Sequence, residues 1–168
     1  MPALAGSSPS TARDLEHLRH AIDLSGRAVA RGDHPFGAVL AGPDGTLLLA
    51  AENTVVTDRD CTGHAETNLV RLACRAHTPE FLRGTTLYTS AEPCAMCAGA
   101  IYWSGIGRVV FGLPEADLLR LTGSHPDNPT MALPCREVFA RGQRPVEVVG
   151  PLLAEEAAGP HAGFWTEQ

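Results

Sequence analysis

Two short motifs constrain this chain more than any other feature: His64-Ala65-Glu66 and, further along, Pro93-Cys94-Ala95-Met96-Cys97. Together they supply one imidazole, two thiols and one carboxylate that need not bind metal. Zinc takes nitrogen and sulfur ligands in a tetrahedron, and a catalytic zinc site leaves the fourth position to water. The motifs therefore predict a Zn²⁺ site made by His64, Cys94 and Cys97, with Glu66 as a catalytic proton shuttle rather than a ligand.

The residues around both motifs favour helix starts. A proline in the first turn of a helix leaves no hydrogen bond unmade, so Pro93 is expected to open a helix. Cys94 and Cys97, three positions apart, would then share one face of that helix. The dipole near its N-terminus favours the thiolate, which is the form of cysteine that binds metal. His64 follows a turn-like segment, 58–63, and is expected to begin a second helix.

Three other interpretations of the motifs remain open. A closed, structural zinc site would need a fourth protein ligand, which Cys61, Cys74 or Cys135 could supply. A C-x-x-C redox pair on a thioredoxin-like unit would leave the H-A-E motif unexplained. The motifs could also be a chance occurrence or an inactive site. A catalytic site is favoured because it uses all four side chains.

Composition bounds the fold and the compartment. With 168 residues, 44% of them hydrophobic, the chain can bury one core, and we expect a single domain spanning 1–168. Residues 1–10 are small and polar and are expected to be disordered. We expect no signal peptide and no membrane span, because no apolar run approaches the required length. Five cysteines, an odd count, favour the reducing cytoplasm.

The charge distribution argues against nucleic acid as a partner. The net charge is −6, and all 13 basic residues are arginines. No basic residue follows Arg144, whereas four glutamates do. Nucleic-acid backbones are bound by clusters of lysine and arginine. The chain offers no such cluster at its C-terminal end.

Hydrophobic periodicity and turn signals predict alternating helices and strands. Helices are expected at 11–31, from His64 to about 76, from Pro93 to about 103, at 115–121, at 136–141 and from Pro151. Strands are expected at 36–41, 46–51, 85–89, 108–111 and 146–149, and an extended tail at 159–168. This pattern predicts an α/β domain, a three-layer α/β/α sandwich whose five-stranded mixed sheet has helices on both faces. Periodicity alone does not predict the strand order.

With the metal motifs in hand, the chain resembles the cytidine-deaminase-like superfamily and, within it, bacterial guanine deaminases. An H-x-E motif with a P-C-x-x-C motif is typical of zinc deaminases that act on nucleobases. The likeness spans roughly 18–112. Besides the metal motifs it rests on Pro35-Phe36-Gly37-Ala38-Val39, Asn53, Leu87-Tyr88-Thr89-Ser90 and Gly99-Ala100-Ile101-Tyr102-Trp103, the last of which favours the guanine branch.

The resemblance implies roles for further residues. It implies that Asn53 hydrogen-bonds the base, that Phe36 lies beside the substrate ring and that the Ala65 backbone N–H meets a base carbonyl. Considered alone, Asn53 would more often cap a turn, and Phe36 would more often be a core aromatic. The resemblance also implies a homodimer, in which the C-terminal segment can swap between subunits.

Three segments depart from the family pattern. Cys61 stands where relatives usually carry a proline. The loop 123–129 lies about where guanine deaminases bring an acid to the substrate, and Asp127 is the candidate, with His125 behind it. The tail carries Phe164 and Trp165, which we expect to dock. Trp165 would bind substrate if the tail is an active-site lid, and otherwise it would patch the core or a subunit interface.

These features lead to an expected activity. The chain is expected to be a zinc-dependent aminohydrolase of a free nucleobase, with guanine to xanthine plus ammonia as the leading case. Cytosine or another aminopyrimidine or triazine is the first alternative, and adenosine in a tRNA is the second. From a different class, the chain could be a zinc-containing binding module without turnover. The expected partner is a small-molecule substrate.

Overall fold

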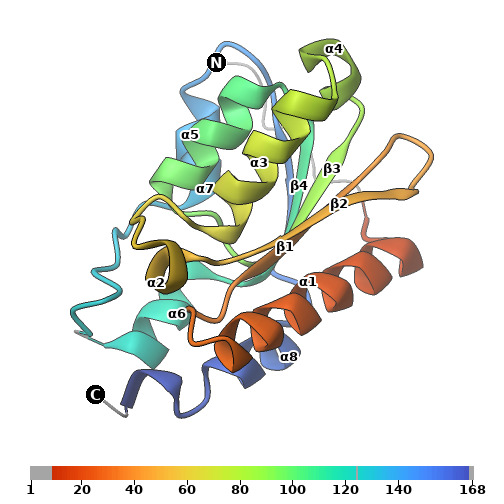
Figure 1. Ribbon diagram of the computed structural model, residues 1–168. Helices are drawn as coiled ribbons and strands as arrows, with labels where there is room; N and C mark the ends of the chain where they lie inside the picture. Colours follow the sequence, from red (N-terminus) through yellow and green to blue (C-terminus); the bar gives the residue numbers. More distant parts are fainter. Residues whose placement is uncertain (1–8, 124, 167–168) are drawn as a thin grey trace.

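The computed structural model describes residues 9–123 and 125–166, and its centre is a five-stranded sheet in the order β2-β1-β3-β4-β5 (Figure 1). Its strands are β1 (Gly37–Ala41), β2 (Leu47–Glu52), β3 (Thr86–Ala91), β4 (Arg108–Leu113) and β5 (Glu147–Val149). β1 pairs antiparallel with both β2 and β3, whereas β3, β4 and β5 run parallel. The sheet is therefore mixed, as expected.

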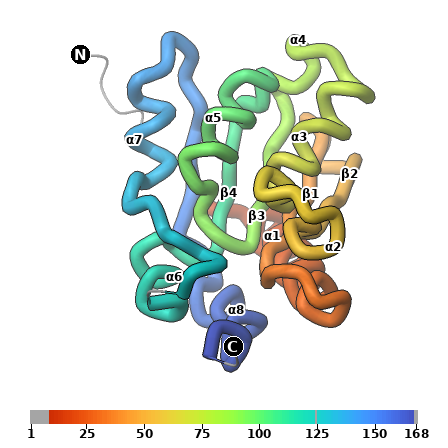
Figure 2. The backbone as a smooth tube through the Cα atoms, turned by 60° about the vertical axis from the view of Figure 1, so that its left-hand side comes forward, coloured from red at the N-terminus to blue at the C-terminus, as the bar shows by residue number. Residues whose placement is uncertain are grey.

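Helices cover both faces of this sheet. They are α1 (Ala12–Ala30), α2 (Val55–Asp58), α3 (Ala65–Ala76), α4 (Pro79–Leu82), α5 (Ala95–Ser104), α6 (Glu115–Thr122), α7 (Cys135–Ala140) and α8 (Ala154–Ala158). Figure 2 shows α7, α5 and α3 in a row over one face, and α1 and α8 pack on the other. One apolar cluster fills each interface, around Leu69, Ile101 and Phe111 on the first face and around Leu18, Val39 and Val110 on the second. The predicted three-layer architecture is confirmed.

Most predicted helices and strands are present within a few residues of their expected bounds. α2 and α4, each four residues long, were not predicted. The helix expected from Pro151 begins only at Ala154, because the Leu152 N–H is hydrogen-bonded to the Phe111 carbonyl and keeps the chain against β4. The tail is not extended but forms two short 3₁₀ turns, Gly159–His161 and Phe164–Thr166. The predicted disorder concerns mainly residues 1–8, which lie outside the described residues.

No helix in the described ranges is long and apolar enough to cross a membrane. All five cysteines are free thiols.

A buried ion pair ties α1 to the sheet. Asp14, 2% exposed, accepts hydrogen bonds from Arg108 at 2.7 and 3.1 Å and from the Tyr88 hydroxyl at 2.9 Å. Its second oxygen also accepts the Thr11 N–H, completing the capping box of α1. Burial alone would raise the pKa of Asp14, but these hydrogen bonds outweigh burial and hold the pKa well below its ordinary value.

The substitution Asp14→Asn is therefore expected to lower the free energy of unfolding by about 3 kcal/mol at pH 7, because it leaves Arg108 partly uncompensated. A depressed pKa stabilises the folded state above the unfolded pKa of about 4, and this contribution declines as the pH falls below it. Denaturant titrations at pH 7 and pH 3 should show a smaller difference between variant and wild type at pH 3. Asp23→Asn, on the exposed side of α1, is the matched control and should change stability by less than about 0.5 kcal/mol.

Candidate active site

The site lies at the carboxyl ends of β3 and β4. Ala91 at the end of β3 pairs with Leu113 at the end of β4, so the segments that follow these strands start side by side. In open α/β sheets, ligands bind in the crevice outside the carboxyl ends of parallel strands. Cys94 caps α5 at this edge, and His64 caps α3, which packs against α5. The fold thus brings both metal motifs to one place.

One local detail differs from the sequence prediction. Pro93 does not open α5, because Cys94 itself has extended backbone angles and serves as the N-cap. The helix begins at Ala95, and Cys97 lies in its first turn. Both sulfur atoms still sit at the N-terminal end of the helix, where the dipole favours thiolates.

The three predicted ligands fit a zinc ion. The Nδ1 atom of His64 lies 3.6 Å from Sγ of Cys94 and 3.5 Å from Sγ of Cys97. Tetrahedral bonds of about 2.05 Å to nitrogen and 2.3 Å to sulfur place such atoms about 3.6 Å apart. In the described part of the chain, these residues are the one group of three or more His, Cys, Asp or Glu side chains arranged to hold a metal. The exposed Cys61 and Cys74 and the buried Cys135 do not belong to it.

The thiols differ in acidity before metal enters. Hydrogen bonding from Cys97 and from His64 outweighs burial and lowers the pKa of Cys94 to about 4. The same contact with Cys94, together with burial, raises the pKa of Cys97 well above its ordinary value. Of the two cysteines, Cys94 is therefore the one that favours the thiolate beside His64 in the absence of metal. Metals bind thiolates, so the site is prepared to take a cation.

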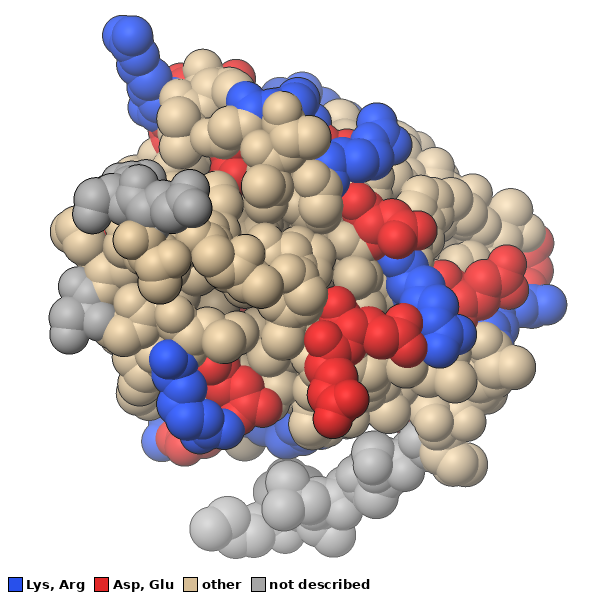
Figure 3. Space-filling model, turned by 90° about the horizontal axis from the view of Figure 1, so that it is seen from below, with Lys and Arg blue, Asp and Glu red and all other residues tan. Residues whose placement is uncertain are grey.

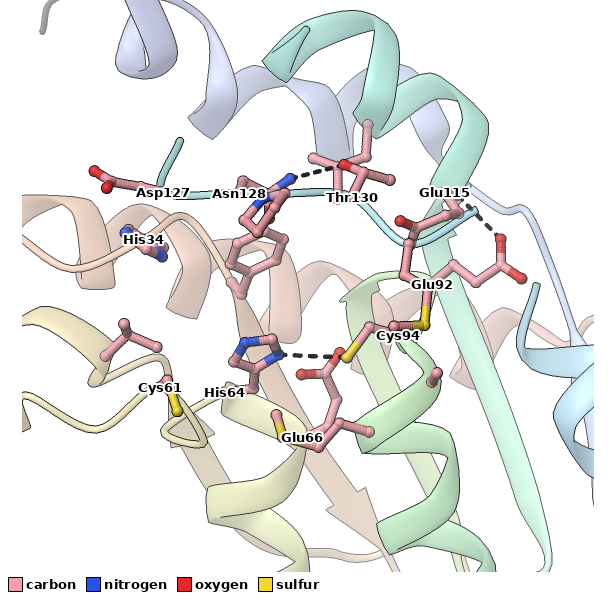
Figure 4. A pocket seen from close by; sticks show the side chains of 17 residues that line it. His34, Cys61, His64, Glu66, Glu92, Cys94, Glu115, Asp127, Asn128 and Thr130 are labelled. Atoms are coloured by element: carbon pink, nitrogen blue, oxygen red, sulfur yellow. Dashed lines mark hydrogen bonds between the residues drawn. The ribbon is translucent and has the colours of Figure 1, made fainter. Parts of the chain in front are cut away.

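Glu66 lies next to the ligands in the wall of the site (Figure 4). Its side chain is buried, with 4% of the residue exposed. The Thr89 hydroxyl donates to Oε1 of Glu66 at 2.9 Å, while Oε2 lies 3.6 Å from Sγ of Cys97. Burial raises the pKa of Glu66 above its ordinary value. A fixed carboxyl group with a raised pKa suits proton transfer in both directions.

A cavity of about 310 Å³ opens onto these residues. Four of its lining residues are acidic, namely Glu66, Glu92, Glu115 and Asp127. None of the described residues that line it is an arginine, and the chain contains no lysine. A substrate carrying a phosphate would meet carboxylates here without an arginine or lysine from the described wall. The cavity favours a small, uncharged or cationic ligand.

The predicted substrate contacts fall into two groups. Phe36 and Asp127 line the cavity, while Asn53 and Ala65 are fully buried beside it. Asn53 accepts the Val55 N–H through Oδ1, as a turn-capping residue does. Its Nδ2 group, however, is buried without a hydrogen-bond partner. A buried donor without a partner is costly, and contact of this group with a substrate stays a prediction.

Trp165 lies one layer behind the cavity rather than in its wall. The indole ring packs against His34 and Phe36, which do line the cavity, at centroid distances of 5.5 and 6.4 Å. Its Nε1 donates to His161, which is 2% exposed, and His125 packs on its other side. The tail thus packs onto its own chain: its first 3₁₀ turn contacts α1 and its second contacts α6. Figures 1 and 2 both show the C-terminal end of the chain next to these helices. Direct contact of Trp165 with substrate stays a prediction.

Sequence reasoning gave no role to two of the acidic residues in the cavity wall, Glu92 and Glu115. Glu92 directly follows β3, and Glu115 follows β4 after one intervening proline. Polar residues at the carboxyl ends of adjacent parallel strands are the signal that could have identified them. That signal requires knowing that β3 and β4 are neighbours. Burial, together with Cys94, Glu92 and Glu66, raises the pKa of Glu115 to about 7.

Comparison with known proteins assigns the chain to a family. The family described as the cytidine and deoxycytidylate deaminase zinc-binding region matches residues 11–113, which contain both metal motifs. The chain belongs to this deaminase family. Its cofactor is therefore zinc, and the group formed by His64, Cys94 and Cys97 could hold it.

Individual relatives of this family differ in their substrates. The chain is 43% identical to a probable cytosine deaminase of Schizosaccharomyces pombe over 159 residues, 95% of this chain and 96% of that protein. It is 40% identical to the guanine deaminase of Bacillus subtilis over 101 residues, 60% of this chain and 64% of that protein. A tRNA-specific adenosine deaminase of Bacillus subtilis is 33% identical over 157 residues, 92% and 90% of the two chains. The solved structure of NE0047 in complex with 2,6-diaminopurine has a TM-score of 0.77 and 26% identity, covering 96% of this chain and 85% of that chain.

Proposed function

We propose that the protein is a zinc-dependent hydrolytic deaminase of a free nucleobase. The observation that carries the proposal is the cavity itself. It joins the His64, Cys94 and Cys97 group to the carboxyl group of Glu66, and its described wall offers no arginine or lysine for a phosphate. Its volume of about 310 Å³ lies at the lower end of the range typical of small-molecule sites.

In the proposed reaction the amino group of the base is replaced by a carbonyl oxygen, and ammonia leaves. Zinc on its three ligands would supply an activated water as the nucleophile. Glu66 takes up the proton that the attacking water loses and delivers it to a ring nitrogen. Later it takes the proton of the new hydroxyl group on the ring carbon and carries it to the departing amine, so that ammonia leaves and the carbonyl forms. Thr89 holds the Glu66 carboxyl in place for these transfers. Asn53 and the Ala65 backbone N–H orient the base, with Phe36 against its ring.

Guanine is our leading substrate, with xanthine as product. The sequence Gly99 to Trp103 on α5, the Bacillus subtilis relative and the diaminopurine bound by the structural neighbour support it. Cytosine is the second candidate, because the Schizosaccharomyces pombe relative aligns over nearly the whole of both chains.

Ammonia release from guanine, cytosine, adenine, melamine and a tRNA substrate tests the proposal directly. We expect turnover of at least one free base and none of the tRNA. Turnover of the tRNA alone would reject the proposal.

The surface charge also bears on RNA as a substrate. Figure 3 shows the face seen from below Figure 1, where arginines lie among acidic residues without forming a basic groove on this face. Recognition of an RNA strand would need such a groove.

For Asn53, the substitution Asn53→Ala is expected to lower kcat/KM about 10- to 100-fold, because it removes the unpaired Nδ2 donor. Asn53→Asp is the informative partner variant, since it keeps the acceptor for the Val55 N–H but loses the donor. Both variants should lose activity, and Asn53→Asp should also melt earlier, because it buries a carboxylate oxygen that has no partner; activity is therefore compared per folded molecule. If Asn53→Ala unfolds early but retains its activity per folded molecule, Asn53 is a turn cap and nothing more.

The proposed homodimer has a candidate surface on α5. This helix carries no charged residue, and it buries Cys97, Ala98 and Ile101 on one side. On its outer side Trp103 is 84% exposed and Met96 is 39% exposed. An indole left in water on an apolar helix is typical of a protein interface. We propose that a second copy of the chain covers it.

Light scattering after gel filtration tests this proposal. The wild type is expected to be a dimer, and Trp103→Arg is expected to be a monomer with its fold intact. Leu47→Arg, which changes a 40% exposed residue on β2, is the control and should leave the dimer unchanged. A monomeric wild type at micromolar concentration would exclude the dimer.

A further inference from the structure

Glu115 is a carboxylate of the cavity wall for which the proposed chemistry has no use. It begins α6 immediately after β4 and Pro114, and it is 8% exposed. Figure 4 shows its side chain between Thr130 and Cys94, across the cavity from His64. Among the described residues, no side chain or backbone group hydrogen-bonds or ion-pairs with its carboxyl group.

The position of Glu115 is fixed from behind. One oxygen of Glu92 accepts the Glu115 N–H at 3.0 Å, and the other accepts the Cys135 N–H at 3.0 Å. The Glu92 N–H in turn donates to the carbonyl of Leu113 at 2.8 Å. The backbone of Glu115 is therefore fixed at the edge of the sheet, whereas its carboxyl group is available to bind a ligand in the cavity.

The residue is largely buried, but its carboxyl group faces the cavity, where a bound ligand can take the place of water as its hydrogen-bond partner. In its ionised form the Glu115 carboxylate only accepts hydrogen bonds, so a ligand that pairs with this form must bring an N–H or O–H donor. Aminated heterocycles carry such donors on ring nitrogens and on exocyclic amino groups. Glu92 is less available than Glu115, because each of its oxygens already accepts one backbone N–H group, whereas the carboxyl group of Glu115 accepts none from the described residues.

We propose that Glu115 is a specificity-determining residue, whose carboxylate accepts a hydrogen bond from an N–H of the heterocycle away from the carbon that loses its amino group. This inference rests on the proposed deaminase function and narrows its substrate class. Bases with a free N–H at that position are preferred as substrates. Bases without this N–H, or with a methyl group on that nitrogen, are poor substrates. A site built to bind a polar group discriminates strongly against analogues without that group.

The test compares the active base with analogues that are N-methylated at one ring position. For guanine these are 7-methylguanine and 9-methylguanine, and for cytosine the analogue is 1-methylcytosine. One of the methyl groups should lower kcat/KM of the wild type about 10- to 100-fold. Glu115→Ala should lower kcat/KM of the parent base by a similar factor, and in this variant the same methyl group should cost much less.

Glu115→Gln keeps an acceptor oxygen without the charge, so it should fall between the wild type and Glu115→Ala. Asp117→Asn removes a carboxylate from the same helical turn outside the cavity and should match the wild type. Zinc content and melting temperature are measured for every variant. If Glu115→Ala weakens all substrates equally, with the methyl penalty unchanged, Glu115 only supports the fold and the inference is overturned. A wild type that deaminates no free base overturns the proposed function, and the inference with it.

Discussion

Glu66→Ala is expected to lower kcat by at least about 10²- to 10⁴-fold while the protein keeps its zinc and its fold. Among the described residues, the carboxyl group of Glu66 is the acidic group in contact with both Cys97 and the Thr89 hydroxyl, so the other carboxylates of the cavity wall are not placed to replace it. Stability should be unchanged or higher, because removing a buried carboxylate relieves its desolvation. Steady-state ammonia release, zinc analysis and thermal unfolding of one preparation measure all three properties.

Two further variants separate proton transfer from simple loss of volume. Glu66→Gln has nearly the same shape but cannot accept a proton, and it should be as inactive as Glu66→Ala. Glu80→Gln changes an exposed glutamate on α4 and should match the wild type. Normal turnover by Glu66→Gln would show that another group moves the proton.

The second large effect concerns the metal. Cys97→Ala is expected to reduce the zinc content from one ion per chain to nearly none, and to abolish activity with it. Metal binding is coupled to folding, so the melting temperature should fall as well. Elemental analysis after gel filtration measures the zinc content directly.

The remaining cysteines provide the controls for that experiment. Cys61→Ala, Cys74→Ala and Cys135→Ala should each retain their zinc, because the three-residue group contains none of them. Loss of zinc in any of these variants would indicate a fourth protein ligand, which makes a closed, structural site. A catalytic site instead keeps that position open.

The outline of the fold could be predicted from the sequence because its signals are local. The apolar stripe of α1 involves the residues of a single helix, and the turn at 42–45 involves only the two strands that it connects. The short helices α2 and α4 carry too few residues to show periodicity. The strand order is decided by which faces pack together, and no local pattern encodes that.

The candidate site divides in the same way. His64, Glu66, Cys94 and Cys97 belong to two contiguous motifs whose chemistry and spacing are visible in the chain. Glu115 is an isolated acid in the sequence and becomes recognisable only once β3 and β4 are neighbours. Glu92 directly precedes the P-C-x-x-C motif, and only its place in the cavity wall requires the fold. The position of Trp165 behind His34 and Phe36 depends on how the tail docks, and the apolar residues of the tail predict docking without its location.

The hydrogen bonds of Glu92 also indicate which segment of the fold could be replaced to change the substrate preference. Its two oxygens hold the first residue of α6 and the first residue of α7, so a single side chain clamps both ends of the excursion that carries Asp127. The metal ligands lie on α3 and α5, outside that excursion. Residues 116–123 and 125–134 are therefore anchored at both ends by one side chain, while Leu118 packs into the core and His125 packs on Trp165 of the tail. Grafting the segment between Glu115 and Cys135 from a relative, with Glu92, Glu115, Leu118 and Cys135 kept and the tail exchanged along with it, should transfer substrate preference while leaving the catalytic centre in place.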